Sequence, residues 1–244
     1  MSNVAIQLKD VSKAFNGKKV LEKISFDVHA GEVLGLLGRS GTGKSVTLKL
    51  IVGLIGSDEG EIFIDEENIQ QLERQELMRV RAKIGFLFQN AALFDSISLG
   101  KNLEFPLRRA GKSKSEIAEI VRTRLEEVGL EQDANKMPAD LSGGMRKRAG
   151  LARALVLDPP IILVDEPSSG LDRITAGEIY ELLGKLKQQK KTLIVVTHDA
   201  MGVRPIADRM CLIDQGKVLV CGPPEELEKD SNDLVRSLVT GGCT

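Results

Sequence analysis

The chain has 244 residues, which is long enough for one large domain or for a core with a subdomain. Its 34 Lys and Arg residues against 35 Asp and Glu residues give a net charge of −1, so we expect no attraction of the whole chain to nucleic acid or anionic lipid. The N-terminus "MSNVAIQLKD" does not have the pattern of a signal peptide, and no apolar run reaches the ~18 residues of a membrane span. These features predict a cytoplasmic protein that reaches a membrane only through a partner.

Alternating apolar and polar residues mark the N-terminal part of the chain. Residues 4–15, 20–29 and 60–69 follow this period of two, which predicts half-buried antiparallel strands in a small β layer. Three other stretches are short apolar runs: 32–38, 161–166 and 192–199. Each ends in polar residues and is followed by a helical pattern. Such runs are typical of parallel strands that are covered on both faces and carry functional residues at their C-terminal ends.

Between residues 90 and 156 the pattern becomes helical. Ser113 and Glu116 have the spacing of a capping box, and Gly129 is placed to end the helix that follows. One face of that helix is apolar, formed by Ile117, Ile120, Val121, Leu125 and Val128. We interpret this region as a helical insert in an α/β core.

The last part of the sequence predicts a hairpin and closing helices. Gln215 and Gly216 lie near the expected hairpin turn, and "PPEELEKDSNDLVRSLV" predicts one or two helices. No repeat, low-complexity segment or linker separates an independent domain. We therefore expect a single domain with a core of about 1–89 and 157–222, a helical insert of about 90–156 and C-terminal helices of about 223–244.

The sequence "GRSGTGKS" has the spacing of a phosphate-binding loop, and it follows a predicted strand and precedes a predicted helix. Glycines such as Gly38 and Gly43 allow main-chain N–H groups to surround a phosphate. Lys44 supplies a charge for the β- and γ-phosphate oxygens, and the Ser45 hydroxyl is a ligand for Mg²⁺. The predicted fold class is α/β, with a RecA-like core of the P-loop NTPase type.

Two further strand ends carry residues suited to hydrolysis. Asp165 can hold the Mg²⁺ shell and Glu166 can accept a proton from the attacking water, with a helix N-terminal charge cluster as the alternative interpretation. A lone histidine is more often structural, but His198 ends the third apolar run, on the same edge of the sheet. The amide of Gln89 can contact Mg²⁺ or water, although its own stretch favours a solvent-facing turn residue.

A second pair of glycines, in "LSGGM", stands at the start of a predicted helix, where main-chain N–H groups bind anions. An N-cap followed by a turn is the alternative. With the motifs in this order, the chain resembles the ATPase subunit of an ABC transporter over nearly its whole length. The resemblance implies two copies paired head to tail, in which the ATP of one copy meets the signature residues of the other, Ser142, Gly143 and Gly144.

The same resemblance assigns further roles. It implies that ATP is bound by Gly38, Arg39, Ser40, Gly41, Thr42, Gly43, Lys44, Ser45 and Val46. It implies that Phe15 stacks on adenine, with a core aromatic as the alternative, and that Asp172 is the D-loop aspartate. The implied catalytic residues are Glu166, His198, Lys44 and Gln89, and the implied Mg²⁺ ligands are Ser45, Gln89 and Asp165.

Several details are similar to the ATPase of Mla-type phospholipid transport systems, which work with MCE-domain proteins. Met145 and Val46 replace a usual Gln and a usual hydroxyl residue, and "NAALFDSIS", "LEFPLR" and "GLDRITAGEI" belong to the same set. The similarity implies permease subunits whose cytoplasmic helices contact residues 91–94, unless that segment is buried in the insert. It also implies an MCE-domain protein, admits a small regulatory subunit, and puts the chain on the cytoplasmic face of the inner (plasma) membrane through the permease.

One departure limits this match, and two alternative functions remain open. Arg173 stands where this family has Pro, and the basic cluster 146–148 is assigned to packing and dimer electrostatics rather than to lipid. The first alternative is the ATPase of an importer for a small polar solute. The second is a soluble ABC ATPase that acts as a scaffold, as in iron–sulfur cluster assembly.

Overall fold

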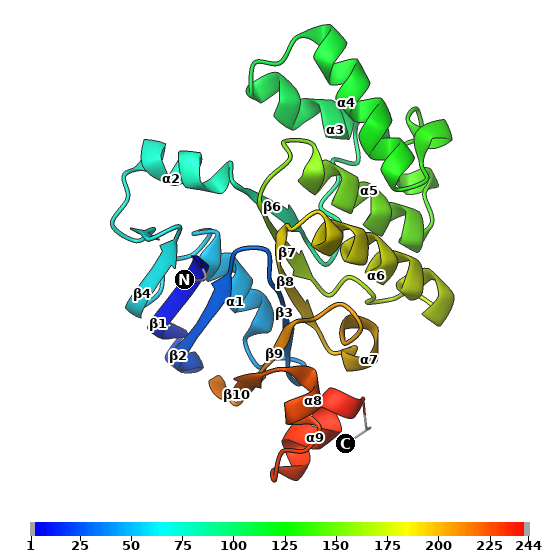
Figure 1. Cartoon of the computed structure of the whole chain (residues 1–244). Helices are drawn as coiled ribbons and strands as arrows, with labels where there is room; N and C mark the ends of the chain where they lie inside the picture. Colours follow the sequence, from blue (N-terminus) through cyan, green and yellow to red (C-terminus); the bar gives the residue numbers. More distant parts are fainter. Residues whose placement is uncertain (1–2, 242–244) are drawn as a thin grey trace.

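The computed structural model describes residues 3–241, which form two β-sheets with helices around and beyond them (Figure 1). The larger sheet has six strands in the order β10-β9-β3-β8-β7-β6. All of its neighbouring strands are parallel except β9 and β10. The bounds are Val33–Leu37 (β3), Ile84–Leu87 (β6), Ile161–Asp165 (β7), Thr192–Thr197 (β8), Arg209–Asp214 (β9) and Lys217–Gly222 (β10).

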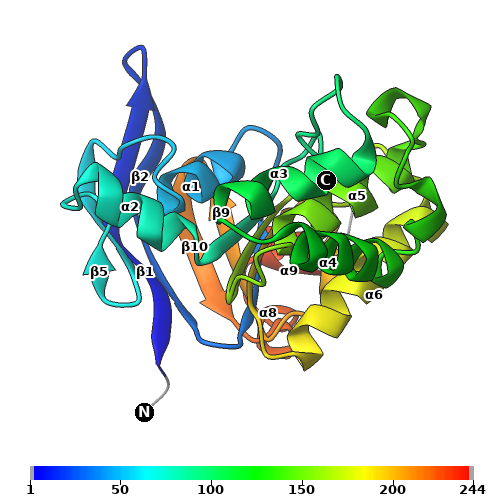
Figure 2. The same cartoon turned by 90° about the horizontal axis from the view of Figure 1, so that it is seen from above.

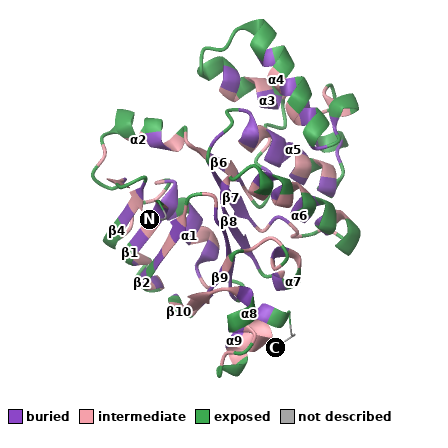
Figure 3. Ribbon diagram, in the orientation of Figure 1, coloured by how far each residue is buried: buried purple, intermediate pink, exposed green. Residues whose placement is uncertain are grey.

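The central strands β3, β7 and β8 are buried along their whole length, as the purple ribbon in the middle of Figure 3 indicates. This confirms the prediction that the three apolar runs are parallel strands covered on both faces. Because the strands are parallel and adjacent, their C-terminal ends meet at one edge of the sheet. The residues that follow these three strands therefore lie close together.

The smaller sheet is antiparallel, in the order β2-β1-β4-β5, and confirms the expected β layer, but the single strand expected over 60–69 is wrong, because positive φ angles at Asp65 and Glu66 turn the chain back on itself to form β4 and β5. Its strands are Val4–Phe15 (β1), Lys18–His29 (β2), Glu59–Ile64 (β4) and Glu67–Asn68 (β5). Apolar residues of this sheet, of the large sheet and of helix α1 (Lys44–Ile51) form one buried cluster. Helix α2 (Arg74–Arg81), for which the sequence pattern made no prediction, connects the small sheet to β6.

Residues 90–156 form helices α3 (Leu99–Arg109), α4 (Lys114–Glu127) and α5 (Gly143–Leu155), with short 3₁₀ turns at Glu131–Asp133 and Pro138–Asp140. Seen from above, these helices lie on the opposite side of the molecule from the β1–β2 hairpin (Figure 2). They share a buried apolar cluster of their own, and α5 packs on β6. The capping box is confirmed: Ser113 Oγ accepts from the Glu116 N–H, and Glu116 accepts from the Ser113 N–H.

The remaining helices are α6 (Arg173–Gln188), α7 (Ala200–Val203), α8 (Pro224–Leu227) and α9 (Asp233–Thr240). The predicted hairpin is confirmed as β9 and β10, with positive φ angles at Gln215 and Gly216 in the turn. The predicted closing segment forms two helices, α8 and α9, and the expected range to 244 extends beyond the described residues. Within residues 3–241, no helix is both long and apolar enough to cross a membrane.

Candidate active site

A cleft of about 420 Å³ opens at the edge of the large sheet where β3, β7 and β8 end. The loop after β3, the residue after β7 and the residue after β8 all reach it, as the topology predicts. Two residues that the sequence did not single out, Val20 and Ser169, complete the wall. The lining is Val20, Ser40, Gly41, Gly43, Lys44, Ser45, Val46, Gln89, Glu166, Ser169 and His198.

Lys44 begins helix α1 and turns its side chain back over the preceding loop. Its ammonium group donates to the carbonyl oxygens of Gly38 at 2.8 Å and Arg39 at 2.9 Å, and only 5% of the residue is exposed. Burial lowers the pKa of Lys44, while the negative charges of Glu166 and Asp165 oppose this shift. The loop thus holds a largely dehydrated ammonium group. An anionic phosphate oxygen placed beside it would stabilise its charge.

The shape of the loop depends on Gly43, which caps α1 with a φ of 99°. A Cβ at this position would lie 2.5 Å from the Leu21 side chain, so both the backbone angle and the packing require glycine. Within the loop, the Arg39 carbonyl also accepts from the hydroxyl of Thr42 at 2.9 Å. The exposed residues Ser40 and Gly41 leave the mouth of the cleft open.

Two oxygen ligands suited to Mg²⁺ lie together at the base of the cleft. The Ser45 hydroxyl donates to Asp165 Oδ1 at 2.7 Å, and burial raises the pKa of Asp165 while this hydrogen bond opposes the shift. Among residues 3–241, no group of three His, Cys, Asp or Glu side chains is placed to enclose a metal ion. A hydroxyl and one carboxylate fit Mg²⁺, which usually takes its other ligands from water and phosphate oxygens.

Gln89 reaches the same cleft from the end of β6, where it is exposed and its Nε2 lies 3.5 Å from the Ser169 hydroxyl. The structure therefore brings the amide to the mouth of the cleft, beside the segment that leads into the helical insert.

Glu166 stands between two basic side chains. His198 Nδ1 lies 2.7 Å from Glu166 Oε2, and Lys44 Nζ lies 3.8 Å from Glu166 Oε1. The backbone of Glu166 has a φ of 47°, in the left-handed region that is rare for residues with a side chain. Such strain is typical of residues held for function. The carboxylate thus lies in the cleft, where it can orient water or accept a proton from it.

The glycine pair of "LSGGM" begins helix α5 outside the lining of this cleft, and Gly143 lines a neighbouring pocket together with Gln89 and Ser169. Ser142 is the N-cap, and its Oγ accepts from the Met145 N–H at 3.2 Å, a capping role that is compatible with the signature assignment. Ser142 and Gly143 are both exposed, while Gly144 is buried against α6. A Cβ on Gly144 would lie 2.3 Å from Thr175 Cγ2, so glycine is needed for this close approach. The exposed helix start remains open to a ligand or a second molecule.

Phe15 and Asp172 lie outside the lining of the cleft, as do Gly38, Arg39 and Thr42 of the loop itself. Phe15 ends β1 with 43% of the residue exposed and a lysine, Lys13, 5.4 Å from its ring, so the core alternative is wrong. Val20, just after the β1–β2 turn, forms the cleft wall on this side. Asp172 caps α6 by accepting from the N–H groups of Ile174 and Thr175, each at 3.0 Å.

Sequence reasoning assigned Lys147 only to packing and dimer electrostatics, whereas the structure buries it and directs its Nζ to the main-chain oxygen of Glu166 at 2.7 Å. It did not single out Asn102, whose buried amide donates to the carbonyls of Phe94, Ile97 and Ser98 and accepts from the Phe94 N–H. A polar residue within an otherwise apolar helical face was the available signal for Asn102. The signal for Lys147 was its position five residues after the N-cap Ser142, in phase with buried positions of α5.

Comparison with known proteins agrees with this geometry. The profile of the family described as ABC transporter matches residues 21–169. "Probable ribonucleotide transport ATP-binding protein mkl" of Mycobacterium leprae is 44% identical over 98% of this chain and 69% of its own length. "Methionine import ATP-binding protein MetN" of Clostridium tetani is 41% identical over 91% of this chain and 70% of its own length. The chloroplastic "Protein TRIGALACTOSYLDIACYLGLYCEROL 3" of Arabidopsis thaliana is 36% identical, over 98% and 74% respectively.

A solved structure is similar in fold: a dimeric ATP-binding cassette in a post-hydrolysis state, bound to ADP and Pi, has a TM-score of 0.83 and 35% identity, and covers 89% of this chain and 98% of its own. The matched residues include the phosphate-binding loop, the signature segment and the Asp165–Glu166 pair. The family, the fold and the cleft agree on nucleotide hydrolysis. The chain is therefore an ATP-binding ATPase that belongs to the ABC transporter family.

Proposed function

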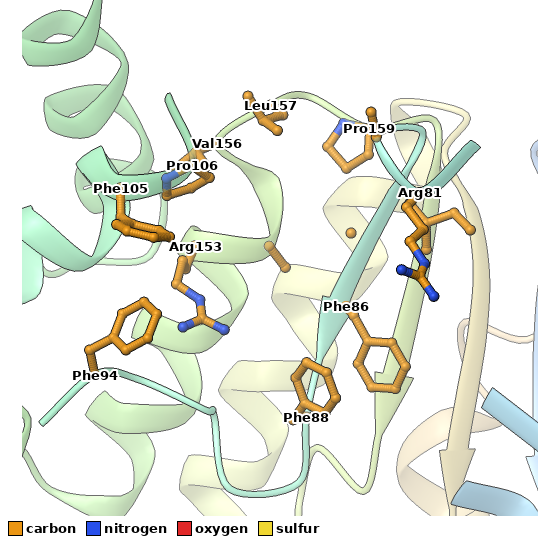
Figure 4. Close-up of a pocket in the computed structure, with 14 residues that line it drawn as sticks. Arg81, Phe86, Phe88, Phe94, Phe105, Pro106, Arg153, Val156, Leu157 and Pro159 are labelled. Atoms are coloured by element: carbon orange, nitrogen blue, oxygen red, sulfur yellow. The ribbon is translucent and has the colours of Figure 1, made fainter. Parts of the chain in front are cut away.

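We propose that this ATPase works as a head-to-tail homodimer on the cytoplasmic face of the inner membrane, where it drives phospholipid transport through permease subunits of an MCE-type system. The observation that carries the transport part of the proposal is a second, apolar cleft of about 310 Å³ between β6, α3 and α5. Four of the seven phenylalanines in the chain line it: Phe86, Phe88, Phe94 and Phe105 (Figure 4).

The aromatic side chains of this cleft are arranged in two pairs. Phe86 and Phe88 stack with ring centroids 4.0 Å apart, and Phe94 and Phe105 meet edge to face at 5.2 Å. Phe94 and Phe105 are 45% and 44% exposed, which leaves apolar ring surface in contact with water. Aromatic residues gathered in a groove favour contact with a partner protein, and an amphipathic helix is the usual occupant of such a groove.

For segment 91–94 the sequence left two alternatives, contact with a permease and burial in the helical insert, and each fits a different part of the segment. Ala91 is buried against Gly150 of α5, whereas Phe94 faces the cleft. The guanidinium of Arg153 lies 5.8 Å from the Phe94 ring centroid and donates to the Ala92 carbonyl, and burial lowers its pKa. Figure 4 shows this guanidinium between the two aromatic pairs. A permease helix with an acidic residue among apolar ones would complement both the rings and the cation.

In the proposed reaction, water attacks the γ-phosphorus of ATP, the bond from that phosphorus to the β–γ bridging oxygen breaks, and ADP and inorganic phosphate leave. Lys44 binds the β- and γ-phosphate oxygens, and Glu166, held by His198, positions or deprotonates the water. Ser45 and Asp165, with Gln89 nearby, would hold Mg²⁺, which would neutralise phosphate charge when bound. Gln89 lines the nucleotide cleft, and the segment that follows it, 91–94, reaches the aromatic cleft proposed to bind the permease. Through this segment, ATP hydrolysis is coupled to movement of the permease.

The homodimer is supported by the exposed start of α5. Ser142 and Gly143 are exposed at this helix start, where the first main-chain N–H groups have no acceptor within the helix. Placed across the phosphates of another copy, the helix start completes an anion site that neither copy has alone. ATP then stabilises the closed pair, because only that state uses both elements.

Phospholipid as the cargo is supported by the similarity to Mla-type ATPases and by a relative that is named for a glycolipid. To test the proposal, tagged Glu166→Gln protein with ATP and Mg²⁺ is recovered from mildly solubilised native membranes, and bound proteins and lipids are identified by mass spectrometry. We expect a multi-span permease, an MCE-domain protein and phospholipid. Soluble partners alone would contradict the transport proposal while leaving the ATPase activity intact.

A matched pair of variants tests the groove in the same experiment. Phe105→Arg in the Glu166→Gln background should release the permease, because a cation beside Arg153 replaces an apolar contact. Leu219→Arg, at a similarly exposed apolar residue of β10, is the control and should retain it. Equal recovery of permease by both variants would argue against docking in this groove.

Import of a small polar solute is the second candidate, and it is favoured by one specific observation, the 41% identity to a methionine import ATPase. The two candidates differ in what accompanies the permease. A solute-binding protein in the recovered complex, without an MCE-domain protein or bound phospholipid, would decide for solute import.

A further inference from the structure

Lys147 is the buried cation that connects the signature helix to the catalytic glutamate. It lies on α5, five residues after the N-cap Ser142, and is only 6% exposed. Within residues 3–241 it forms no ion pair with a carboxylate at 4.0 Å or less, and its Nζ donates to the main-chain oxygen of Glu166 at 2.7 Å. A buried ammonium group is costly unless it is well bonded, so this placement is unusual for a residue that only packs.

The group that Lys147 binds belongs to a strained residue. Glu166 has a φ of 47°, and its N–H donates to the Val196 carbonyl of β8 at 2.8 Å. Its carbonyl accepts from Lys147 Nζ and, at the longer distance of 3.3 Å, from the Ser169 N–H. A backbone in this region persists when the surrounding contacts hold it. Lys147 therefore helps to hold the peptide group from which the Glu166 carboxylate is directed into the cleft.

The same helix presents the signature residues to the other copy in the proposed dimer. Helix α5 is packed closely at its start, where Gly144 lies against Thr175, and one turn beyond Lys147, where Gly150 lies against Ala91. Ser142 and Lys147 are about one and a half turns apart, so a displacement at the first reaches the second with little loss. Each chain thus has a direct mechanical link between its signature and its own Glu166.

We propose that Lys147 is a positioning residue that adjusts Glu166 according to whether the signature of the same chain is engaged. The proposal rests on the homodimer described above. In that dimer, the signature of one chain contacts the ATP of the second site, while Glu166 acts at the first. Lys147 then makes hydrolysis at one site depend on occupation of the other.

The test compares Lys147→Met, Lys147→Arg and the control Lys191→Met. Lys191 is a suitable control because its Nζ also donates to a main-chain oxygen, that of Asp158 at 3.2 Å, away from the cleft. We expect Lys147→Met to lower kcat for ATP by about tenfold or more with KM changed less than about twofold, since misplacement of a reacting group costs up to ~10² in rate. Lys147→Arg can donate to the same carbonyl and should recover most of kcat.

Two further measurements separate positioning from a structural role. In the Glu166→Gln background, Lys147→Met should still dimerise with ATP, because the variant leaves the signature residues intact. In the active enzyme, Lys147→Met should lower the Hill coefficient for ATP toward one. Replacement of a buried charge by an apolar residue is often tolerated, and Lys147→Gln serves as the second variant if Lys147→Met does not fold.

The outcomes distinguish this inference from the proposed dimer. If the Glu166→Gln protein fails to dimerise with ATP, the dimer is wrong and the inference fails with it. If that protein dimerises but both Lys147→Met and Lys147→Gln retain the kcat and Hill coefficient of the unmodified chain, only the inference is overturned. A loss of kcat shared equally by Lys191→Met would also overturn it.

Discussion

The edge of the large sheet and the start of α5 are both proposed to bind phosphate, but they differ in how their polar groups are hydrogen-bonded. At the sheet edge, Ser45 contacts Asp165 and His198 contacts Glu166, each at 2.7 Å, and Lys44 is bonded to its own loop. At the start of α5, the exposed Ser142 hydroxyl accepts a hydrogen bond from the Met145 N–H of its own helix. The first region is assembled within one chain, whereas the second presents its groups outward. In the proposed dimer, a site divided in this way would have full activity only when two molecules meet.

The largest predicted effect is at the edge of the large sheet, where the site is assembled within one chain. Glu166→Gln keeps the size of the side chain and removes the charge that can accept a proton. We expect the turnover of ATP to fall by about 10² or more while ATP binding persists, because general-base assistance is worth about that factor. Glu119→Gln, on the exposed side of α4, is the matched control. Undiminished hydrolysis in a Glu166→Gln protein would remove Glu166 from this role.

A smaller effect is expected from the outward-facing region. Ser142→Arg replaces the exposed N-cap by a long side chain, so the hydroxyl can no longer face the phosphate of a second copy. A hydrogen bond to a charged group contributes ~1.5–3 kcal/mol, and we expect ATP-dependent dimerisation to weaken by at least about tenfold. Sedimentation of the variant in the Glu166→Gln background measures it, with Ser231→Arg in the exposed α8–α9 connection as control. Dimerisation as strong as that of the control would count against the head-to-tail pair.

The same contrast explains how far the sequence alone could be interpreted. The three central strands and the residues at their ends were predictable, because strand pattern and topology together require Lys44, Asp165, Glu166 and His198 to share one edge. The helical insert, its capping box and the β9–β10 hairpin were predictable from local signals alone. Each of these features follows from residues that are close in sequence or from one rule of sheet topology.

Other features depend on contacts between distant segments and have no local signal. The bond from Lys147 to the main chain of Glu166 joins two motifs 19 residues apart, and a basic residue on a helix is usually solvated. The aromatic cleft collects rings from β6, the segment after it and α3, so its existence depends on how the insert packs. The position of Phe15, outside the cleft wall that Val20 forms, likewise depends on how the β1–β2 hairpin lies over the loop.

The third prediction concerns the close packing of the start of α5 on α6, where Gly144 lies against Thr175. Gly144→Ala places a methyl group within 2.3 Å of Thr175 Cγ2, and overpacking of this kind costs about 1–3 kcal/mol. Urea unfolding should report that loss. Thr175→Ser removes the methyl group and retains the hydroxyl that donates to Asp172, so it should rescue much of the stability of Gly144→Ala. Additive effects of the two substitutions would exclude this contact as the cause.

The smallest predicted effect lies in the helical insert, at the exposed capping box of α4. Hydrogen bonds from the Ser113 N–H, Lys112 and the Ser113 hydroxyl lower the pKa of Glu116 from 4.5 to about 2. Because the folded-state pKa is the lower one, the ionised carboxylate stabilises the fold above pH 4.5, and this contribution is lost as the pH falls from 4.5 to about 2. Glu116→Gln should therefore be less stable than the unmodified chain at neutral pH, by an amount that shrinks across that window. Urea unfolding at several pH values, with the exposed Glu119→Gln as control, measures the difference. If this stability difference is independent of pH, the Glu116 side chain stabilises the cap through its shape and not through its charge. The cap would then resemble the apolar contacts within the insert more closely than the charged contacts at the edge of the large sheet.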